Sequence, residues 1–207
     1  MPIVVVGGHT RNIGKTSVVA GLIAALPDRH WTAIKITQFG HNVCSANGEP
    51  CDCETADHTI AISEERSRTS GTDSARYLAA GAEHSFWVRT RQGQLAEAMP
   101  RLRALIAEAD NIIVESNSIL RFLRPDIFIS VLDPTVADFK PSALRYLDRA
   151  DAVVMPETTT EVTWEHVSPS LIARAQKFTM TPEIFCSADL TAFVANRLCN
   201  IQAPQHS

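Results

Sequence analysis

The sequence predicts an α/β fold of three layers, in which a mostly parallel sheet of about seven strands carries helices on both faces. Short apolar runs alternate along the chain with segments whose apolar residues recur at helical spacing. Strands that are apolar throughout indicate burial on both faces, which is typical of parallel sheets. The chain has 207 residues, a length that suits one domain with its own core. We therefore expect a single domain over residues 1–200 and a flexible tail at 201–207.

The predicted elements follow in a regular order. Apolar runs predict strands at 3–6, 31–37, 84–88, 111–115, 126–132, 152–155 and 183–186. Helical spacing predicts helices at 15–26, 73–80, 94–109, 142–149, 168–176 and 190–198. Pro27 is expected to end the first helix, and Gly81 to cap the second. The polar stretch 38–72, which contains three cysteines, is expected to be an insertion loop.

The first predicted strand leads into the most informative motif of the chain. A tight loop follows Ile3–Gly8, and Gly14-Lys15-Thr16 then opens a helix. This order predicts a phosphate-binding P-loop, the hallmark of the P-loop NTPase fold, whose backbone N–H groups surround phosphates. Lys15 is expected to neutralise the outer phosphates and Thr16 to bind Mg²⁺. The residues predicted to bind the nucleotide are Asn12, Ile13, Gly14, Lys15, Thr16 and Ser17.

The P-loop departs from the usual spacing at one position. The common pattern has a glycine five residues before the glycine of Gly-Lys-Thr, and this chain has His9 there. The nearest glycine is Gly8, one residue earlier. The loop therefore carries one extra residue compared with the commonest P-loop enzymes.

Charged residues stand where other predicted strands end, and ligands of such folds bind at the carboxyl ends of the strands. Lys35 lies among apolar residues of the second strand. It is either a second phosphate-contacting lysine or a strand-end lysine whose ammonium reaches water. Glu115 ends an apolar strand, as expected of a carboxylate that organises Mg²⁺ or orients water. We therefore predict catalytic roles for Lys15, Lys35 and Glu115, and Mg²⁺ ligation by Thr16 and Glu115.

Several polar residues remain ambiguous in the sequence. Asp73 opens a predicted helix and is either near its N-cap or directed into the active cleft. Asp133 precedes a proline, which favours a turn, and Asp138 is interpreted as a solvated loop charge. Lys140 is open to both a solvent and a ligand interpretation.

The polar loop holds a candidate metal site. Cys44, Cys51 and Cys53 lie within ten residues, and His58 follows them. Thiolates and imidazoles are Zn²⁺ ligands, and a closed site needs four. Zn²⁺ bound by these four residues is one interpretation; an iron–sulfur site, loosely packed free thiols and redox chemistry are the others. Cys186 and Cys199 are expected to be packing residues.

Composition and charge exclude several functional classes. The net charge is −4, so nothing indicates a nucleic-acid-binding surface. No apolar run approaches the ~20 residues of a membrane span. The chain enters its first strand without a basic leader, so we expect no secretory signal, a cytoplasmic location and no disulfides.

The motifs from residue 3 to residue 116 together resemble the MobB family of nucleotide-binding adapter proteins in molybdopterin-guanine dinucleotide biosynthesis. The matching parts are the P-loop, Ile34-Lys35-Ile36-Thr37, Thr72-Asp73-Ser74-Ala75-Arg76 with Ala80-Gly81-Ala82, and Ile112-Ile113-Val114-Glu115. The resemblance implies a dimeric protein that binds ATP or GTP with Mg²⁺ and assists molybdenum cofactor synthesis, with a pterin cofactor as a candidate partner. This chain departs from the family at His9, in the segment after Thr37, and at Ser116-Asn117-Ser118, where the family has glycine.

Two other functions compete with the adapter. The spacing from Gly8 to Gly14, with Lys35 on the second strand, is similar to dethiobiotin synthetases, which implies an ATP-dependent kinase or ligase acting on a small acceptor. A nucleotide-controlled metallochaperone that uses the Cys44–Cys53 loop is the third. The sequence has no Asn-Lys-x-Asp guanine signature. Residues 156–159 and 187–189, which follow late strands, are candidates for contacting the base.

Overall fold

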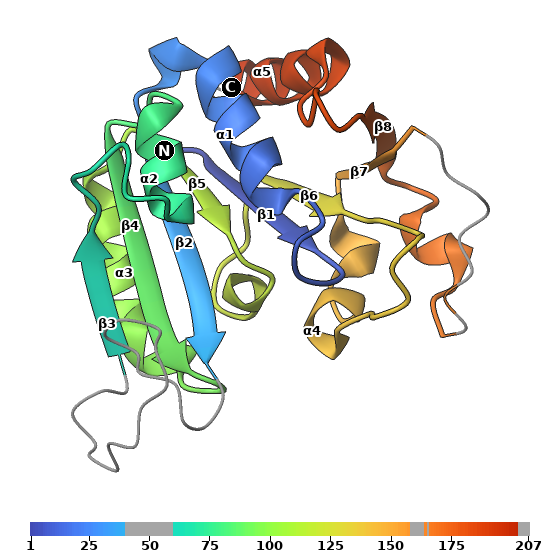
Figure 1. Ribbon diagram of the computed structural model, residues 1–207, viewed down its shortest axis with the longest axis horizontal. Coiled ribbons are helices and arrows are strands. Elements are labelled where there is room, and N and C mark those ends of the chain that lie inside the picture. Colours follow the sequence, from blue (N-terminus) through green and yellow to red (C-terminus); the bar gives the residue numbers. More distant parts are fainter. Residues whose placement is uncertain (40–59, 158–163, 165, 203–207) are drawn as a thin grey trace, which may run out of the picture.

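The computed structural model describes residues 1–39, 60–157, 164 and 166–202. These residues form one eight-stranded sheet with the order β3-β4-β2-β5-β1-β6-β7-β8 (Figure 1). The strands are β1 (Ile3–Gly8), β2 (Trp31–Phe39), β3 (Ile60–Glu64), β4 (His84–Arg91), β5 (Asn111–Glu115), β6 (Ile127–Val131), β7 (Ala152–Pro156) and β8 (Gln176–Met180). Only β3 pairs antiparallel among them; every other neighbouring pair is parallel.

Helices cover both faces of the sheet. On one face pack α1 (Lys15–Ala25), α2 (Asp73–Ala79) and α5 (Ala188–Gln202). On the other face pack α3 (Leu95–Glu108) and the short turns η3 (Ser118–Arg121), η4 (Leu147–Arg149) and η5 (Pro169–Ile172). The remaining elements are η1 (Pro27–Arg29) and α4 (Pro141–Leu144). The predicted three-layer α/β fold with a P-loop after its first strand is confirmed.

The position of β1 in the sheet decides where the site forms. Its residues Val4–Gly8 are buried, and it pairs with β5 on one side and β6 on the other. β2 pairs in turn with β5, in a register that puts Lys35 beside Glu115. The carboxyl ends of β2, β5 and β1 therefore lie next to one another, with the loop before α1 above them.

Two strands were missed and one predicted strand was wrong. β3 lies inside the stretch 38–72 that was interpreted as a loop. The helix predicted at 168–176 is wrong: the structure has the short turn η5 there, and β8 begins at Gln176 and runs to Met180. Residues 183–186 form no strand; Ile184 instead exchanges backbone hydrogen bonds with Thr181 in a tight turn. The apolar side chain of Phe185, which favoured a strand there, packs against the core on the face of the sheet that α1 and α5 cover. α5 extends two residues into the predicted tail, whose last five residues lie outside the described part of the chain.

Within the described residues, no helix has both the length and the apolar character that a membrane span requires.

Candidate functional site

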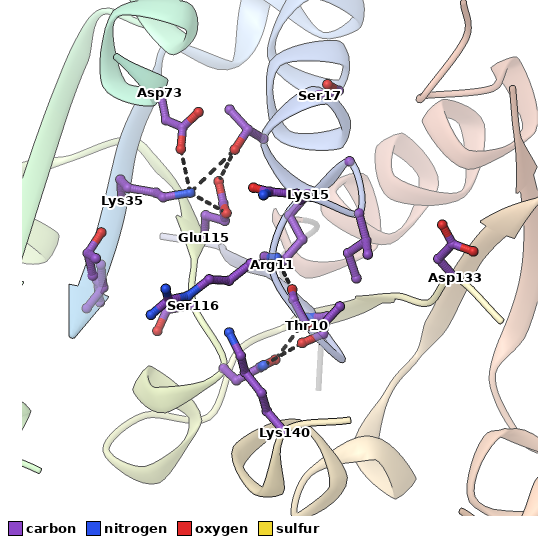
Figure 2. Close-up of a pocket in the computed structure, with 18 of the residues that line it drawn as sticks. Thr10, Arg11, Lys15, Ser17, Lys35, Asp73, Glu115, Ser116, Asp133 and Lys140 are labelled. Atoms are coloured by element: carbon purple, nitrogen blue, oxygen red, sulfur yellow. Dashed lines mark hydrogen bonds and ion pairs between the residues drawn. The ribbon is translucent and has the colours of Figure 1, made fainter. Parts of the chain in front are cut away.

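A cavity of about 1170 Å³ opens at the carboxyl ends of the parallel strands (Figure 2). Its wall includes the loop and helix start from Thr10 to Ser17, the end of β2 from Lys35 to Phe39, and Glu115 with the three residues after it. The far wall comes from the β7 and β8 ends. All six residues predicted to bind the nucleotide and all three predicted to be catalytic lie around this one cavity.

The loop between β1 and α1 presents backbone donors that have no acceptor. No backbone N–H from Thr10 to Ser17 donates to another residue in the described part of the chain. The neighbouring N–H groups are bonded: His9 donates to the Val131 carbonyl at 3.2 Å, and Val18 to the Gly14 carbonyl at 2.9 Å. The run ends in the first turn of α1, where the helix dipole also favours an anion. Such a group of N–H donors is suited to phosphate oxygens.

Two glycines are required by the shape of this loop. A Cβ on Gly8 would lie 2.8 Å from the Val131 carbonyl oxygen, so any side chain there would collide with the backbone. Gly14 has φ 91°, a left-handed conformation that other residues rarely adopt, and a Cβ there would meet the Phe185 ring at 2.8 Å. Asn12, with φ 57°, is the other left-handed residue of the loop. These constraints hold the loop in its open, donor-lined form.

His9, which replaces the expected glycine, is a structural residue. Its buried ring donates from Nδ1 to the Asp138 carbonyl at 2.8 Å, and Nε2 accepts from the Asp133 N–H at 3.0 Å. One donor and one acceptor nitrogen mean a neutral imidazole. Burial lowers the pKa of His9, which is consistent with that state. The extra loop residue therefore fastens the loop to the segment after β6.

Lys15 occupies the position expected of the P-loop lysine. Its Nζ donates to the Thr10 carbonyl at 2.5 Å, on the other side of the same loop. Burial lowers the pKa of Lys15 to about 8, and Glu115 acts in the opposite direction. A phosphate bound within the loop would therefore favour the charged form of this lysine.

Lys35 joins two carboxylates in the cavity wall. Its Nζ lies 2.5 Å from Glu115 Oε1 and 2.8 Å from Asp73 Oδ2, and the side chain is 17% exposed. Figure 2 shows the ammonium between the two acids. Nζ also lies 3.4 Å from the Thr16 hydroxyl. The interpretation of Lys35 as a lysine that merely reaches water is therefore wrong, while its predicted contact with phosphate stays a prediction.

Glu115 is the centre of a buried hydrogen-bonded group. The residue is 3% exposed, and Oε2 accepts from the Thr16 hydroxyl at 2.8 Å and from the Tyr77 hydroxyl. Burial and the adjacent Glu115 carboxylate raise the pKa of Tyr77 well above its usual value, so the phenol stays protonated and donates. The Thr16 and Glu115 oxygens are hard donors side by side, which fits the predicted Mg²⁺ ligands.

α2 resolves the ambiguity at Asp73 and contributes residues that the sequence interpretation missed. Thr72 caps the helix by accepting from the Ala75 N–H at 3.1 Å, so Asp73 is left to face the cavity. Burial raises the pKa of Asp73, but hydrogen bonds from Lys35 and Thr16 outweigh it and the net shift is downward. Arg76 donates to the Ser17 hydroxyl at 2.9 Å and joins α2 to α1. Tyr77 lies four residues after Asp73, on the same helix face, and that spacing could have identified it.

Asn117, two residues after Glu115, binds the backbone of Gly8 in β1. Its side-chain amide accepts from the Gly8 N–H at 3.0 Å and donates to the Gly8 carbonyl at 2.7 Å. A Cβ on Gly7 would collide with this amide, so Gly7 and Asn117 are complementary. The pair ties the end of β5 to the end of β1.

Asp133 and Asp138, which were also ambiguous in the sequence, have structural partners. Asp133 accepts from the Thr135 N–H at 3.0 Å, as in the predicted turn. The Asp138 carboxylate accepts from the Thr10 hydroxyl, so it is not simply a solvated charge. Of the two segments expected to contact the base, the first contributes Pro156 to the cavity wall. In the second, the Ser187 hydroxyl accepts from the Leu190 N–H in the first turn of α5, and Ser187 does not line the cavity.

The cysteine predictions divide between described and undescribed residues. Cys44, Cys51, Cys53 and His58 lie outside the described residues, so Zn²⁺ binding there stays a prediction. Among the described residues, no group of three or more His, Cys, Asp or Glu could hold a metal ion. Cys186 is half-buried at 3.3 Å from the Thr191 hydroxyl, and Cys199 is exposed.

No known protein-family profile matches the chain, and no curated protein sequence matches it significantly. Solved structures give distant similarities. HypB from Helicobacter pylori in complex with nickel has a TM-score of 0.47 and 15% identity, over 99% of this chain and 90% of that one. LpxK from Aquifex aeolicus in complex with ATP has a TM-score of 0.49 and 20% identity, and the match covers 87% of this chain and 54% of LpxK. A zinc-bound triple mutant of the YjiA GTPase has a TM-score of 0.44 and 15% identity, and the match covers 92% of this chain and 61% of that protein. The chain thus spans less than two thirds of the last two proteins. The chain itself is a three-layer α/β protein with a P-loop at the carboxyl end of β1.

Proposed function

We propose that this chain binds a nucleoside triphosphate with Mg²⁺ in the loop between β1 and α1. The observation that carries the proposal is the run of backbone N–H groups from Thr10 to Ser17 without acceptors in the described chain. Unbonded N–H groups at the start of a long helix are strong phosphate donors. Lys15 adds a positive charge inside the same loop.

The donor set beside the loop supports Mg²⁺ as the metal. Thr16 and Glu115 would hold it, since their oxygens already lie 2.8 Å apart. Bound there, Mg²⁺ would supply charge neutralisation on the β- and γ-phosphates. Lys35 would add a second cation at the outer phosphate, once a ligand draws it from Glu115 and Asp73.

The two ends of the cavity favour one direction for the nucleotide. The end near Lys35 and Glu115 is charged, whereas Pro156, Met180 and Pro182 give the other end an apolar wall. Gly14 lies against Phe185 at this apolar end. We therefore assign the γ-phosphate to the charged end and the base to the apolar end.

The adapter role of the MobB family is our first candidate for what the bound nucleotide does. Four residues that carry the resemblance, Lys35, Asp73, Arg76 and Glu115, line the cavity together. This supports a MobB-like NTP-binding protein that assists molybdenum cofactor biosynthesis, with slow hydrolysis, a pterin client and a homodimeric state.

A kinase or ligase that acts on a small acceptor is the second candidate, and the size of the cavity favours it. Its volume of about 1170 Å³ exceeds the roughly 300–1,000 Å³ of ordinary small-molecule pockets. Lys15 and Lys35 would then stabilise charge on the phosphoryl group as it moves to the acceptor.

Calorimetric titration with Mg·ATP and Mg·GTP tests nucleotide binding. We expect the wild type to bind at least one of them, and Lys15→Ala to bind about tenfold more weakly or not at all. Lys177→Ala is the matched control, because Lys177 is exposed on β8 and outside the cavity wall. Failure of the wild type to bind either nucleotide, or equal affinities in Lys15→Ala, would contradict the proposal.

Phosphate release separates the two candidates. An adapter is expected to hydrolyse slowly whatever small acid is added. A rise of about tenfold or more in turnover with a small acceptor would favour the kinase or ligase instead.

A further inference from the structure

Two cations of the cavity wall, Arg11 and Lys140, have no acidic partner. Neither side chain forms an ion pair or hydrogen bond with any residue that the structure describes, although both line the cavity. Arg11 is exposed and Lys140 is half-buried. Unlike Lys35, which has two carboxylates, these cations are available to an anion from outside the chain.

The backbone fixes Lys140 beside the P-loop. Its N–H donates to the His9 carbonyl at 2.9 Å, one residue before the row of unbonded donors begins. Figure 2 shows Lys140 and Arg11 on the same side of the cavity, with Arg11 reaching toward Ser116. The segment after β6 and the P-loop thus bring two positive groups to one place.

Asp138 compensates the charge of Lys140 only in part. Its carboxylate accepts from the Thr10 hydroxyl, and its charge raises the pKa of Lys140, but burial and Arg11 outweigh it. Burial lowers the pKa of Lys140, and the charge of Arg11 lowers it further. An oxyanion between the two cations would relieve this repulsion, since opposite charges favour the protonated lysine.

Ser116 supplies a neutral donor next to the pair. It is 9% exposed, and its Oγ accepts from the Ser118 N–H at 3.1 Å. The hydroxyl hydrogen has no acceptor among the described residues and is left to donate. Ser116 directly follows Glu115, so this donor borders the end of the cavity assigned to the γ-phosphate.

We propose that Arg11, Lys140 and Ser116 form a subsite for the carboxylate or phosphate group of a second molecule, which binds beside the nucleotide. A planar guanidinium pairs with either oxyanion through two parallel hydrogen bonds, and lysine adds a point charge. The proposal rests on the proposed function for the place of the nucleotide. It specifies an anionic acceptor or client.

Titration of small anions into the nucleotide complex tests the subsite. The protein is saturated with Mg²⁺ and β,γ-methylene-ATP, which fills the phosphate loop, and inorganic phosphate or malonate is then added in a calorimeter. We expect the wild type and the Lys177→Ala control to bind at least one anion. Arg11→Ala and Lys140→Ala should bind it about tenfold more weakly. The anion that binds identifies the class, phosphate or carboxylate.

Nucleotide affinity in the same variants completes the test. We expect Lys140→Ala to bind the nucleotide analogue within about threefold of the wild type, with an unchanged melting temperature. Three results would overturn the subsite: neither anion binds, the variants bind it as the wild type does, or Lys140→Ala loses the nucleotide itself.

A failure of the proposed nucleotide binding can be distinguished from a failure of the anion subsite. If the wild type binds no nucleotide, the anions are titrated into the free protein. Binding that depends on Arg11 and Lys140 would still support the subsite, and its absence would overturn both proposals.

Discussion

The P-loop and the cluster of polar side chains beside it differ in whether their hydrogen bonds are already made within the protein. From Thr10 to Ser17, backbone donors face the cavity without acceptors in the described chain. In the cluster of Lys35, Glu115, Tyr77 and Thr16, each polar side chain already has a partner within the protein. The loop is ready for a ligand as it stands, whereas the cluster is complete without one.

This difference predicts what a bound nucleotide must rearrange. The loop needs no change to accept phosphate oxygens, because Gly8, Gly14 and His9 hold it open. Lys35 must leave at least one carboxylate to reach a phosphate, and Mg²⁺ must replace the hydrogen bond between Thr16 and Glu115. Stability should therefore depend mainly on the cluster, and affinity mainly on the loop.

The largest effect on stability is expected at the centre of the cluster. Glu115→Gln removes the buried charge that Lys35, Thr16 and Tyr77 contact, and should lower the free energy of unfolding by about 3 kcal/mol. Urea denaturation followed by circular dichroism measures this. Glu108→Gln, at an exposed position of α3, is the control. A loss no larger than in that control would mean that the cluster is not self-supporting.

The next effect comes from the phenol that supports Glu115. Tyr77→Phe keeps the buried ring and removes only its hydrogen bond to Oε2, so we expect a loss of about 1–2 kcal/mol. The melting temperature should fall by a few degrees, roughly 2–4 °C per kcal/mol for a chain of this size. An unchanged melting temperature would show that the Thr16 hydroxyl alone satisfies Glu115.

On the loop side, stability should depend on pH through His9. Its pKa is lower in the folded protein, chiefly because the ring is buried, so the unfolded chain binds the proton more readily. Stability is then lost as the pH falls below about 6.5, by at most about 1.4 kcal/mol per pH unit. His9→Gln, whose amide offers both a donor and an acceptor, should reduce this slope in denaturation curves between about pH 7 and pH 5. An identical slope in the variant would assign the effect to other groups.

The smallest effect is expected at Asp73, the exposed partner of Lys35. Its side chain is 42% exposed, so water can replace much of the ion pair. Asp73→Asn should change the free energy of unfolding by less than about 1 kcal/mol. A loss as large as that of Glu115→Gln would show that the two carboxylates are equivalent, which contradicts the contrast in their burial.

The P-loop and the strand-end charges could be predicted because their signals are local. Gly14-Lys15-Thr16 follows an apolar strand, Glu115 ends another, and Lys35 lies within the second strand. Ligand sites of parallel sheets form at the carboxyl ends of the strands, so these residues could be expected on one side of the sheet. The register that pairs Lys35 with Glu115 came from the structure. Hydrogen bonds between residues of different elements, such as Tyr77 with Glu115 and Asn117 with Gly8, could be identified only from the tertiary structure.

The errors fall at the edges of the sheet, where the local pattern is weak. β3 and β8 are the two edge strands, and neither is a buried apolar run: β3 is half-exposed and β8 alternates polar and apolar residues. The apolar segment 183–186 suggested a strand, but Phe185 instead packs against Gly14 and Cys186 against Gly21. Tertiary contacts decided its conformation, which periodicity alone does not reveal.

Backbone amide hydrogen exchange tests the central claim most directly, because the claim concerns the N–H groups themselves. We predict that Mg·nucleotide, at a concentration just sufficient to saturate the wild type, slows exchange from Thr10 to Ser17 in the wild type and slows it less, or not at all, in Lys15→Ala. Exchange in α3, none of whose residues lines the cavity, should stay the same in both proteins. A nucleotide that binds while this segment exchanges as fast as before would contradict the account.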